Sequence, residues 1–152
     1  MEKNGLVSMK DYPYAGSKRS CNRNARKMSQ KVASKQLTIV NGDEAKMESL
    51  LASVGPVVIG MTATDKFMHY NGGIYFDQSC PNDCDARGVN HAMVLVGYGT
   101  DKTTYKQPVD YWLVKNSWGT TWGESGYIKM IRSFRGIENN CNVACFTFYA
   151  TV

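Results

Sequence analysis

The chain has 152 residues, 43% of them hydrophobic and 20% charged, so it is long enough to bury a core and has the composition of a globular domain. It has no run of 18 apolar residues and residues 1–5 are polar, so we expect neither a transmembrane helix nor a signal peptide within it. The net charge is +5 without any nucleic-acid-binding motif, so we expect no nucleic acid and no membrane as a partner.

The first 34 residues are polar and rich in Asn, Ser, Lys and Arg, with a rigid turn at Tyr12-Pro13-Tyr14. Seven Lys and Arg residues fall within positions 18–35. Such a positive stretch can attract anionic partners. Because no recognition motif accompanies it, a solvated loop is the simpler interpretation. We therefore predict an irregular polar segment over residues 1–34.

Residues 35–152 carry the signals of regular structure. Asp43 can cap a helix that runs to residue 53 and is stopped by Gly55-Pro56. The predicted strands are residues 36–40, 56–61, 91–98, 111–115, 126–131 and 146–151. Residues 67–76 are an apolar segment broken by Asn71-Gly72-Gly73, and residues 99–109 are a polar hairpin loop. Short strands joined by turns, with one convincing helix, predict an α+β domain, mainly antiparallel β, in which the sheet forms a partial β-barrel.

The five cysteines indicate an oxidising compartment. Cys80 and Cys84, and again Cys141 and Cys145, share an i, i+4 spacing. Structural zinc sites favour closer Cys-x-x-Cys spacings, so two disulfides are the better interpretation and we expect no metal. Four cysteines allow three pairings, of which we favour Cys80–Cys141 with Cys84–Cys145. Cys21 is then left unpaired, which suggests that its partner lies elsewhere.

Two segments carry the pattern of a nucleophilic site. Residues 90–98 place His91 at the head of an apolar run, and residues 110–122 end an apolar run at Asn116, with Trp118 two residues on. A histidine whose far ring nitrogen is held by an asparagine carbonyl is the oriented base of a Cys–His–Asn site. A histidine at the start of an apolar strand is more often a core residue, but the surrounding pattern favours a base here. His69 lies on a polar turn and is given no role.

These motifs resemble the C-terminal half of a papain-like cysteine peptidase, closest to the cathepsin L group. The resemblance runs in order from residue 4 to residue 152. It is carried by Asn4-Gly5-Leu6, Tyr12-Pro13-Tyr14, Val54-Gly55-Pro56, Gly73-Ile74-Tyr75-Phe76, Asn90-His91-Ala92, Val96-Gly97-Tyr98-Gly99, Tyr111-Trp112-Leu113-Val114-Lys115-Asn116-Ser117-Trp118-Gly119, Trp122-Gly123, Gly126-Tyr127-Ile128-Lys129-Met130 and Asn140-Cys141. On this basis residues 1–34 resemble the end of an N-terminal domain with its interdomain connection, and residues 35–152 the β-barrel-like C-terminal domain.

The resemblance implies roles for individual residues and no cofactor. His91 would be the catalytic base and the imidazolium partner of a thiolate, Asn116 would orient it, and Trp118 would shield their hydrogen bond from water. The pocket for the substrate residue second before the scissile bond would involve Gly60, Val89, Asn90, Ala92 and Phe146, with Trp122 near the primed side of the cleft. Phe146 should shorten this pocket, so we predict a preference for Leu or Val over Phe.

The chain departs from the family at the nucleophile. The family's Cys-Gly-Ser-Cys-Trp-like motif, and the glutamine before it that supplies the oxyanion hole, do not occur here, and Cys21 matches a family cysteine that bridges to the other half. We therefore expect the chain to be inactive by itself. Its expected partners are a peptide or protein substrate and an N-terminal peptidase half or a propeptide-like inhibitor. A catalytically dead binding or inhibitory module is the alternative, and the family implies a lysosomal or extracellular location.

Overall fold

The computed structural model describes residues 7–22, 24, 34–39, 41–133 and 135–151. Contacts group Leu37–Tyr149 into one compact unit and the two ends of the chain, Met1–Gln36 and Ala150–Val152, into another. A boundary between residues 34 and 35 stays a prediction. In chain order the elements are β1 (Ser34–Ile39), α1 (Glu44–Val54), β2 (Val57–Met61), α2 (Asp65–Met68), β3 (Ile74–Tyr75), the 3₁₀ turn η1 (Ala86–Gly88), β4 (His91–Asp101), β5 (Val109–Lys115), β6 (Tyr127–Ile131), the 3₁₀ turn η2 (Asn140–Asn142) and β7 (Phe146–Thr151).

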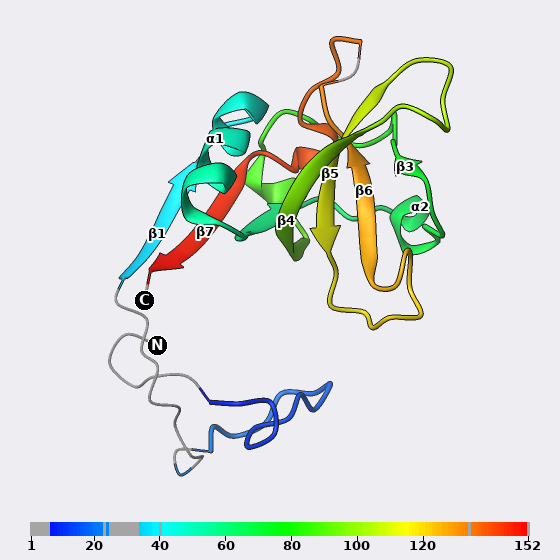
Figure 1. The fold of residues 1–152 in the computed structure, drawn as a ribbon. Helices are drawn as coiled ribbons and strands as arrows, with labels where there is room; N and C mark the ends of the chain where they lie inside the picture. The colour runs from blue at the N-terminus through cyan, green and yellow to red at the C-terminus, as the bar shows by residue number, and fades with distance from the viewer. Residues whose placement is uncertain (1–6, 23, 25–33, 40, 134, 152) are drawn as a thin grey trace. The chain divides into compact units, whose positions relative to one another are not determined.

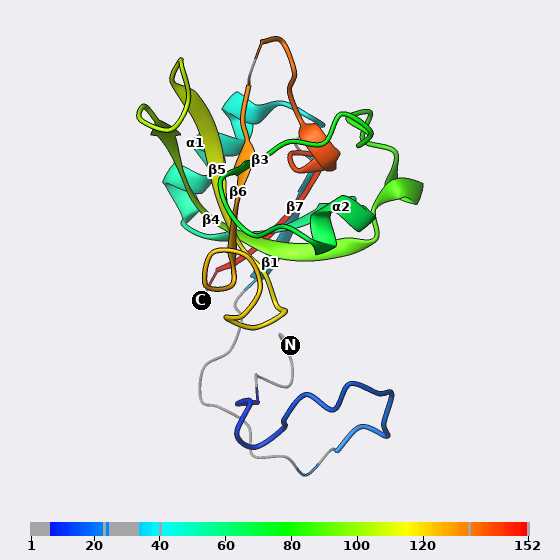
Figure 2. The same cartoon turned by 90° about the vertical axis from the view of Figure 1, so that its right-hand side faces the viewer.

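The strands form one open, mixed sheet with the order β1-β7-β2-β4-β5-β6-β3 (Figure 1). The pairs β2–β7, β2–β4, β4–β5 and β5–β6 are antiparallel. At the edge of the sheet β3 runs parallel to β6 (Figure 2). The predicted fold class, α+β with a mainly antiparallel and unclosed sheet beside one main helix, is therefore confirmed.

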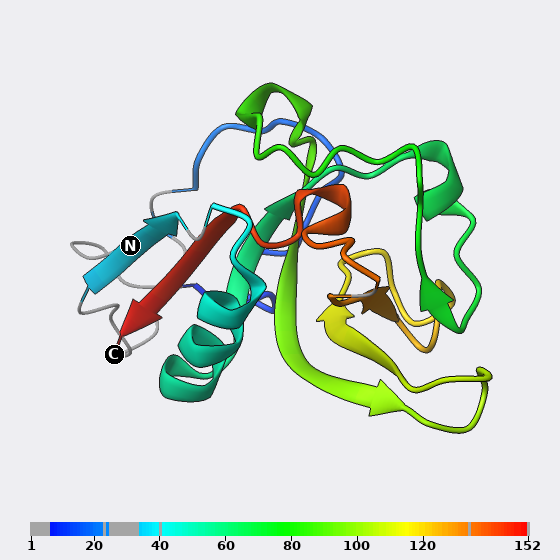
Figure 3. The same cartoon turned by 90° about the horizontal axis from the view of Figure 1, so that it is seen from above.

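The longest strand, β4, differs from its predicted length. It continues to Asp101, where it still pairs with Val109 of β5, so the hairpin loop is shorter than the predicted residues 99–109. The polar residues at this end look like a loop in the sequence, but the opposite strand satisfies their backbone groups. A shift of register between Leu95 and Gly97 accompanies the bend of β4 that is visible in Figure 3.

The core lies on one face of the sheet and is closed by α1. Within β2 the buried side chains of Val57 and Ile59 flank Val58, which is exposed, as the period of two in a strand requires. Asp43 caps α1 as predicted, since its carboxylate accepts a hydrogen bond from Lys46 N at 2.9 Å. Met47 on this helix is fully buried in the core.

The smaller unit contains a tight turn in which the amides of Asp11 and Tyr12 donate to Ser8 O at 3.1 and 2.9 Å. Beyond it Cys21 is exposed and carries a free thiol. Of the basic stretch, Lys18 and Arg19 are exposed. Lys35 lies in β1, whereas Arg23, Arg26, Lys27 and Lys31 lie outside the described residues, as does Val40 of the first predicted strand.

Candidate functional site

His91 and Asn116 meet because β4 and β5 are antiparallel neighbours. His91 is the first residue of β4, and Asn116 directly follows the last residue of β5, so the two lie at the same end of the strand pair. His91 Nε2 is 2.9 Å from Asn116 Oδ1. The backbone amide of Asn116 donates to Gly126 O at 2.9 Å, which anchors the asparagine as the chain leaves the strand.

The orientation of the Asn116 amide follows from a second donor. Ser117 N–H donates to Asn116 Oδ1 at 2.8 Å, and a backbone amide can bond only to an acceptor, so the oxygen is the atom that faces both groups. His91 must then donate its Nε2 proton to this oxygen. Nδ1 is left as the ring nitrogen that can accept or release a proton.

Aromatic rings pack around the imidazole. The Trp118 ring lies 4.9 Å from the His91 ring between centroids, tilted by 34°, and the Phe67 ring lies 5.9 Å away. Phe67 is fully buried and Asn116 is 7% exposed, whereas Trp118 keeps 39% exposure. The His–Asn hydrogen bond is therefore largely covered, and a bond in such a setting is stronger than one in water. Phe67 was not among the residues predicted for the site.

Phe67 is held in place by helix α2 and a buried carboxylate. Thr64 caps α2, with its Oγ1 accepting from Phe67 N at 3.3 Å and donating to Asp77 Oδ2 at 2.8 Å. Tyr75 OH donates to the same oxygen at 3.2 Å, and Ser79 donates to Oδ1 from its amide and its hydroxyl. The cap pattern Thr64-Asp65 before an apolar residue is the sequence signal that would have predicted this short helix.

The same hydrogen bonds set the charge of this cluster. Burial alone would raise the pKa of Asp77, but the hydrogen bonds from Ser79, Thr64 and Tyr75 outweigh it and lower the pKa to about 2. Burial, with the Asp77 carboxylate nearby, raises the pKa of Tyr75 to about 12. Asp77 therefore stays ionised and Tyr75 stays a donor through the range of ordinary pH values.

We expect Asp77 to make stability depend on pH. Its pKa is 3.8 in the unfolded reference and about 2 in the folded chain, so its contribution, about 2 kcal/mol, is complete above pH about 4 and declines as the pH falls toward 2. About half of it should remain at pH 3. In urea unfolding, the stability difference between the wild type and Asp77→Asn should shrink by about 1 kcal/mol from pH 7 to pH 3.

The control for this experiment is Asp83→Asn, which changes an exposed carboxylate in the same loop. That variant should differ little from the wild type at either pH. A difference between the wild type and Asp77→Asn that stays constant with pH would contradict the assignment.

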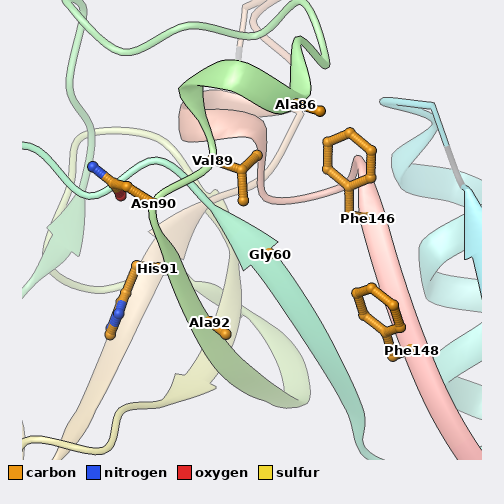
Figure 4. A pocket seen from close by; sticks show the side chains of 8 residues that line it. All are labelled: Gly60, Ala86, Val89, Asn90, His91, Ala92, Phe146 and Phe148. Carbon is orange, nitrogen blue, oxygen red and sulfur yellow. The ribbon is translucent and has the colours of Figure 1, made fainter. Parts of the chain in front are cut away.

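An apolar cavity of about 480 Å³ adjoins His91 (Figure 4). Its lining residues are Gly60, Ala86, Val89, Asn90, His91, Ala92, Phe146 and Phe148. Strand register builds its floor, because Gly60 of β2 pairs with Ala92 of β4 on one side and with Phe146 of β7 on the other. A Cβ on Gly60 would stand 3.1 Å from Val89 Cγ1, so a larger residue would fill the space.

The five residues expected in this pocket are thus brought together, with two additions. Ala86 and Phe148 also line the cavity. The alternation of β7, which puts Phe146 and Phe148 on one face, was the sequence signal for Phe148. Trp122 is not among the lining residues. It packs against Phe67 and Trp118 at centroid distances of 5.2 and 5.3 Å, and its indole N–H donates to Met68 O.

Disulfides join Cys80 to Cys141 and Cys84 to Cys145, the favoured pairing. All four cysteines of the unit that carries His91 are therefore oxidised, and within Leu37–Tyr149 there is no free thiol. Among the residues that the structure describes, no three or more His, Cys, Asp or Glu side chains gather as metal ligands would. The described helices are also too short or too polar to cross a membrane.

Comparison with known proteins places these features in a family. Residues 1–151 match the family described as papain family cysteine protease. The chain is 40% identical to cathepsin L of Sarcophaga peregrina over 149 residues, which are 97% of the chain and 40% of that protein. It is also 40% identical to cathepsin L1 of Drosophila melanogaster over 150 residues, 97% of the chain and 37% of that protein.

A solved structure agrees with these matches. Digestive procathepsin L 3 of the Tenebrio molitor larval midgut superposes with a TM-score of 0.84 at 32% identity, covering 99% of the chain and 45% of that structure. The chain therefore spans less than half the length of each of these three relatives.

Proposed function

Because this chain belongs to the papain family of cysteine proteases, we propose that it supplies the histidine and the asparagine of a cathepsin L-like cysteine endopeptidase. An N-terminal half, not contained in this chain, would supply the nucleophilic cysteine and the glutamine of the oxyanion hole. The observation that carries the proposal is the 2.9 Å contact between His91 Nε2 and Asn116 Oδ1, with the amide oriented by Ser117 N–H.

In the proposed reaction His91 acts through Nδ1. The imidazolium holds the cysteine of the other half as a thiolate, which attacks the peptide carbonyl and forms a tetrahedral intermediate. The oxyanion is stabilised by donors of the other half. Nδ1 then gives its proton to the leaving amine, and the acyl-enzyme is hydrolysed by water that His91 activates. Asn116 keeps the ring aligned throughout, and Trp118 and Phe67 exclude water from the His–Asn bond.

The cavity beside His91 is proposed to bind the side chain of the substrate residue second before the scissile bond. Val89 and Ala92 make its wall aliphatic, Phe146 also lines it, and we expect Phe146 to limit its depth. We therefore expect the assembled protease to cleave peptides with Leu or Val at this position several-fold faster than those with Phe. The measurement is kcat/KM for matched fluorogenic peptides, and a strong preference for Phe would contradict the assignment.

The expected location follows from the cysteines. Two disulfides persist in oxidising compartments, so we propose a lysosomal or extracellular protein. Its partners would be a peptide or protein substrate and the N-terminal half, or a propeptide-like inhibitor.

One observation favours a second function. Since no free thiol lies within Leu37–Tyr149, the same fold could serve as a binding or inhibitory module that grips a peptidase half or a propeptide without catalysis. The retained His91–Asn116–Trp118 arrangement argues for the protease, because a pure binding module does not require it.

The deciding experiment combines the 152-residue chain with the N-terminal half of a cathepsin L relative. Gel filtration confirms assembly, and hydrolysis of a dipeptidyl fluorogenic substrate is compared with that of each half alone. Activity that needs both halves supports the protease. Correct assembly without activity supports the binding module.

A further inference from the structure

Two Asn-Gly pairs in the described part of the chain differ in their surroundings, although Asn41 and Asn71 are both exposed. A third pair, Asn4-Gly5, lies outside the described residues. An asparagine followed by glycine can lose its side-chain ammonia without an enzyme, because the amide nitrogen of the glycine can attack the side-chain carbonyl. Glycine has no Cβ to obstruct that approach, and its backbone can adopt the conformation that the attack needs.

The pair Asn41-Gly42 is held in the fold. The amide of Gly42 donates to Ala144 O at 2.9 Å. A Cβ on Gly42 would lie 3.4 Å from Asn139 Nδ2 and 3.6 Å from Cys84 Sγ, so this turn packs closely on its neighbours. A nitrogen bonded to Ala144 cannot turn toward the side chain of Asn41 unless the turn first opens, and local opening costs free energy.

The pair Asn71-Gly72 lacks such attachments. Both residues are exposed, and within the described part of the chain no group accepts a hydrogen bond from the Gly72 amide or bonds to the Asn71 side chain. The anchors of this turn lie at the next residue, where Gly73 N–H donates to Glu124 Oε1 at 2.9 Å and Gly73 O accepts from Tyr70 OH at 2.6 Å. The nitrogen that would attack Asn71 is therefore free to do so in the folded chain.

We propose that Asn71 is a site of spontaneous deamidation, and that the turn around Asn41 protects that residue from the same reaction. The Gly72 nitrogen loses its proton to hydroxide and attacks Asn71 Cγ, which forms a C–N bond. The bond from Cγ to Nδ2 then breaks, and the nitrogen takes up protons from water and leaves as ammonia. Water adds to either carbonyl of the resulting succinimide and opens it, which gives aspartate or isoaspartate.

The product changes the charge of a turn that lies close to an ion pair. A Cβ on Gly72 would stand 3.7 Å from Glu124 Oε1, and Glu124 Oε2 lies 2.8 Å from Lys129 Nζ. Conversion of Asn71 replaces a neutral amide by a carboxylate, and isoaspartate also adds a carbon to the main chain. Reaction at Asn71 therefore alters the surroundings of the pair Glu124–Lys129.

The test follows both asparagines in the same sample. The full 152-residue chain is incubated at mildly alkaline pH, reduced, digested with trypsin and analysed by tandem mass spectrometry. Cleavage after Lys and Arg places Asn41 in the peptide of residues 36–46 and Asn71 in that of residues 67–87. In the folded chain Asn71 should be converted at least about tenfold faster than Asn41, because only Asn41 has to wait for a local opening.

Two controls separate the effect of the fold from that of the sequence. In concentrated urea both turns are lost, so the two rates should become similar while each asparagine is still followed by glycine. The variant Asn71→Gln keeps an amide but lengthens the side chain, which disfavours ring closure with Gly72. Its peptide of residues 67–87 should stay unmodified at position 71, and since Asn71 is exposed and unbonded the variant should fold like the wild type.

Each outcome decides the matter. A large excess of conversion at Asn71 in the folded chain that disappears in urea supports the inference. Equal rates in the folded chain, or an Asn71 that reacts only in urea, overturn it. A ratio that is the same in urea and in the folded chain also overturns it, because the local sequence and not the fold would then set the two rates.

Discussion

Replacing His91 with alanine is expected to abolish peptide hydrolysis by the chain assembled with an N-terminal half, lowering kcat/KM by at least about 10³-fold. The imidazole has two expected functions in the reaction. It holds the thiolate by its positive charge, and it carries the proton from the nucleophile to the leaving amine. Within the unit Leu37–Tyr149, His91 is the histidine that contacts Asn116, at 2.9 Å.

A graded second variant separates the positioning of the ring from its chemistry. Asn116→Ala keeps the imidazole but removes the acceptor for Nε2–H, so both tautomers become accessible and the ring can turn. We expect a smaller loss, about 10²-fold, with assembly unchanged in gel filtration. Retention of more than a tenth of the activity in His91→Ala would show that the histidine is not the catalytic base.

Replacing Glu44 with alanine is expected to cost the largest amount of stability, about 3–5 kcal/mol. Glu44 begins α1 and is 4% exposed. It accepts hydrogen bonds from Trp112 Nε1 at 3.2 Å, Ser133 N at 2.7 Å and Asn139 N at 3.1 Å. These donors come from β5 and from the two ends of the loop after β6, so one side chain ties three segments together.

The size of the effect follows from what the substitution leaves behind. Trp112 is fully buried and Asn139 is 2% exposed, so their N–H groups would lose their acceptor without regaining water. An unsatisfied buried donor costs about 1–3 kcal/mol, and bonds to a charged acceptor are at the upper end. The measurement is the free energy of unfolding in urea.

Two further variants serve as comparisons for Glu44→Ala. Asp43→Ala removes the cap of the same helix and should cost about 1 kcal/mol. Glu44→Gln keeps one carbonyl oxygen and should fall between the two. If Glu44→Ala were no more destabilising than Asp43→Ala, the hydrogen bonds to Trp112, Ser133 and Asn139 would carry little net free energy.

The parts of the fold that were predicted correctly are those whose signals are local. The Asp43 cap and the Gly55-Pro56 stop bound a helix observed at Glu44–Val54, and alternating apolar residues mark β2, β4, β5, β6 and β7. The two short elements were not predicted, because α2 has four residues and β3 has two, too few to show a periodic pattern. The cap of α2 is held by Asp77, which lies 13 residues after Thr64. Strand β3 is held by its pairing with β6, which is distant in the sequence.

Within the site, the sequence predicts which residues carry chemistry. The segments around His91 and Asn116 predict a base and its orienting amide, and the spacing of four cysteines predicts two crosslinks. Each of these depends on residue type and on position along a single strand or loop, and such information is present in the linear chain.

The tertiary structure decided what surrounds those residues. It placed Phe67 beside His91 and packed Trp122 against Phe67 and Trp118. The physical reason is that packing neighbours and cavity walls are contributed by segments that meet only after the sheet has formed. Their mutual distances are set by strand register and loop conformation, and no pattern along the chain encodes them directly.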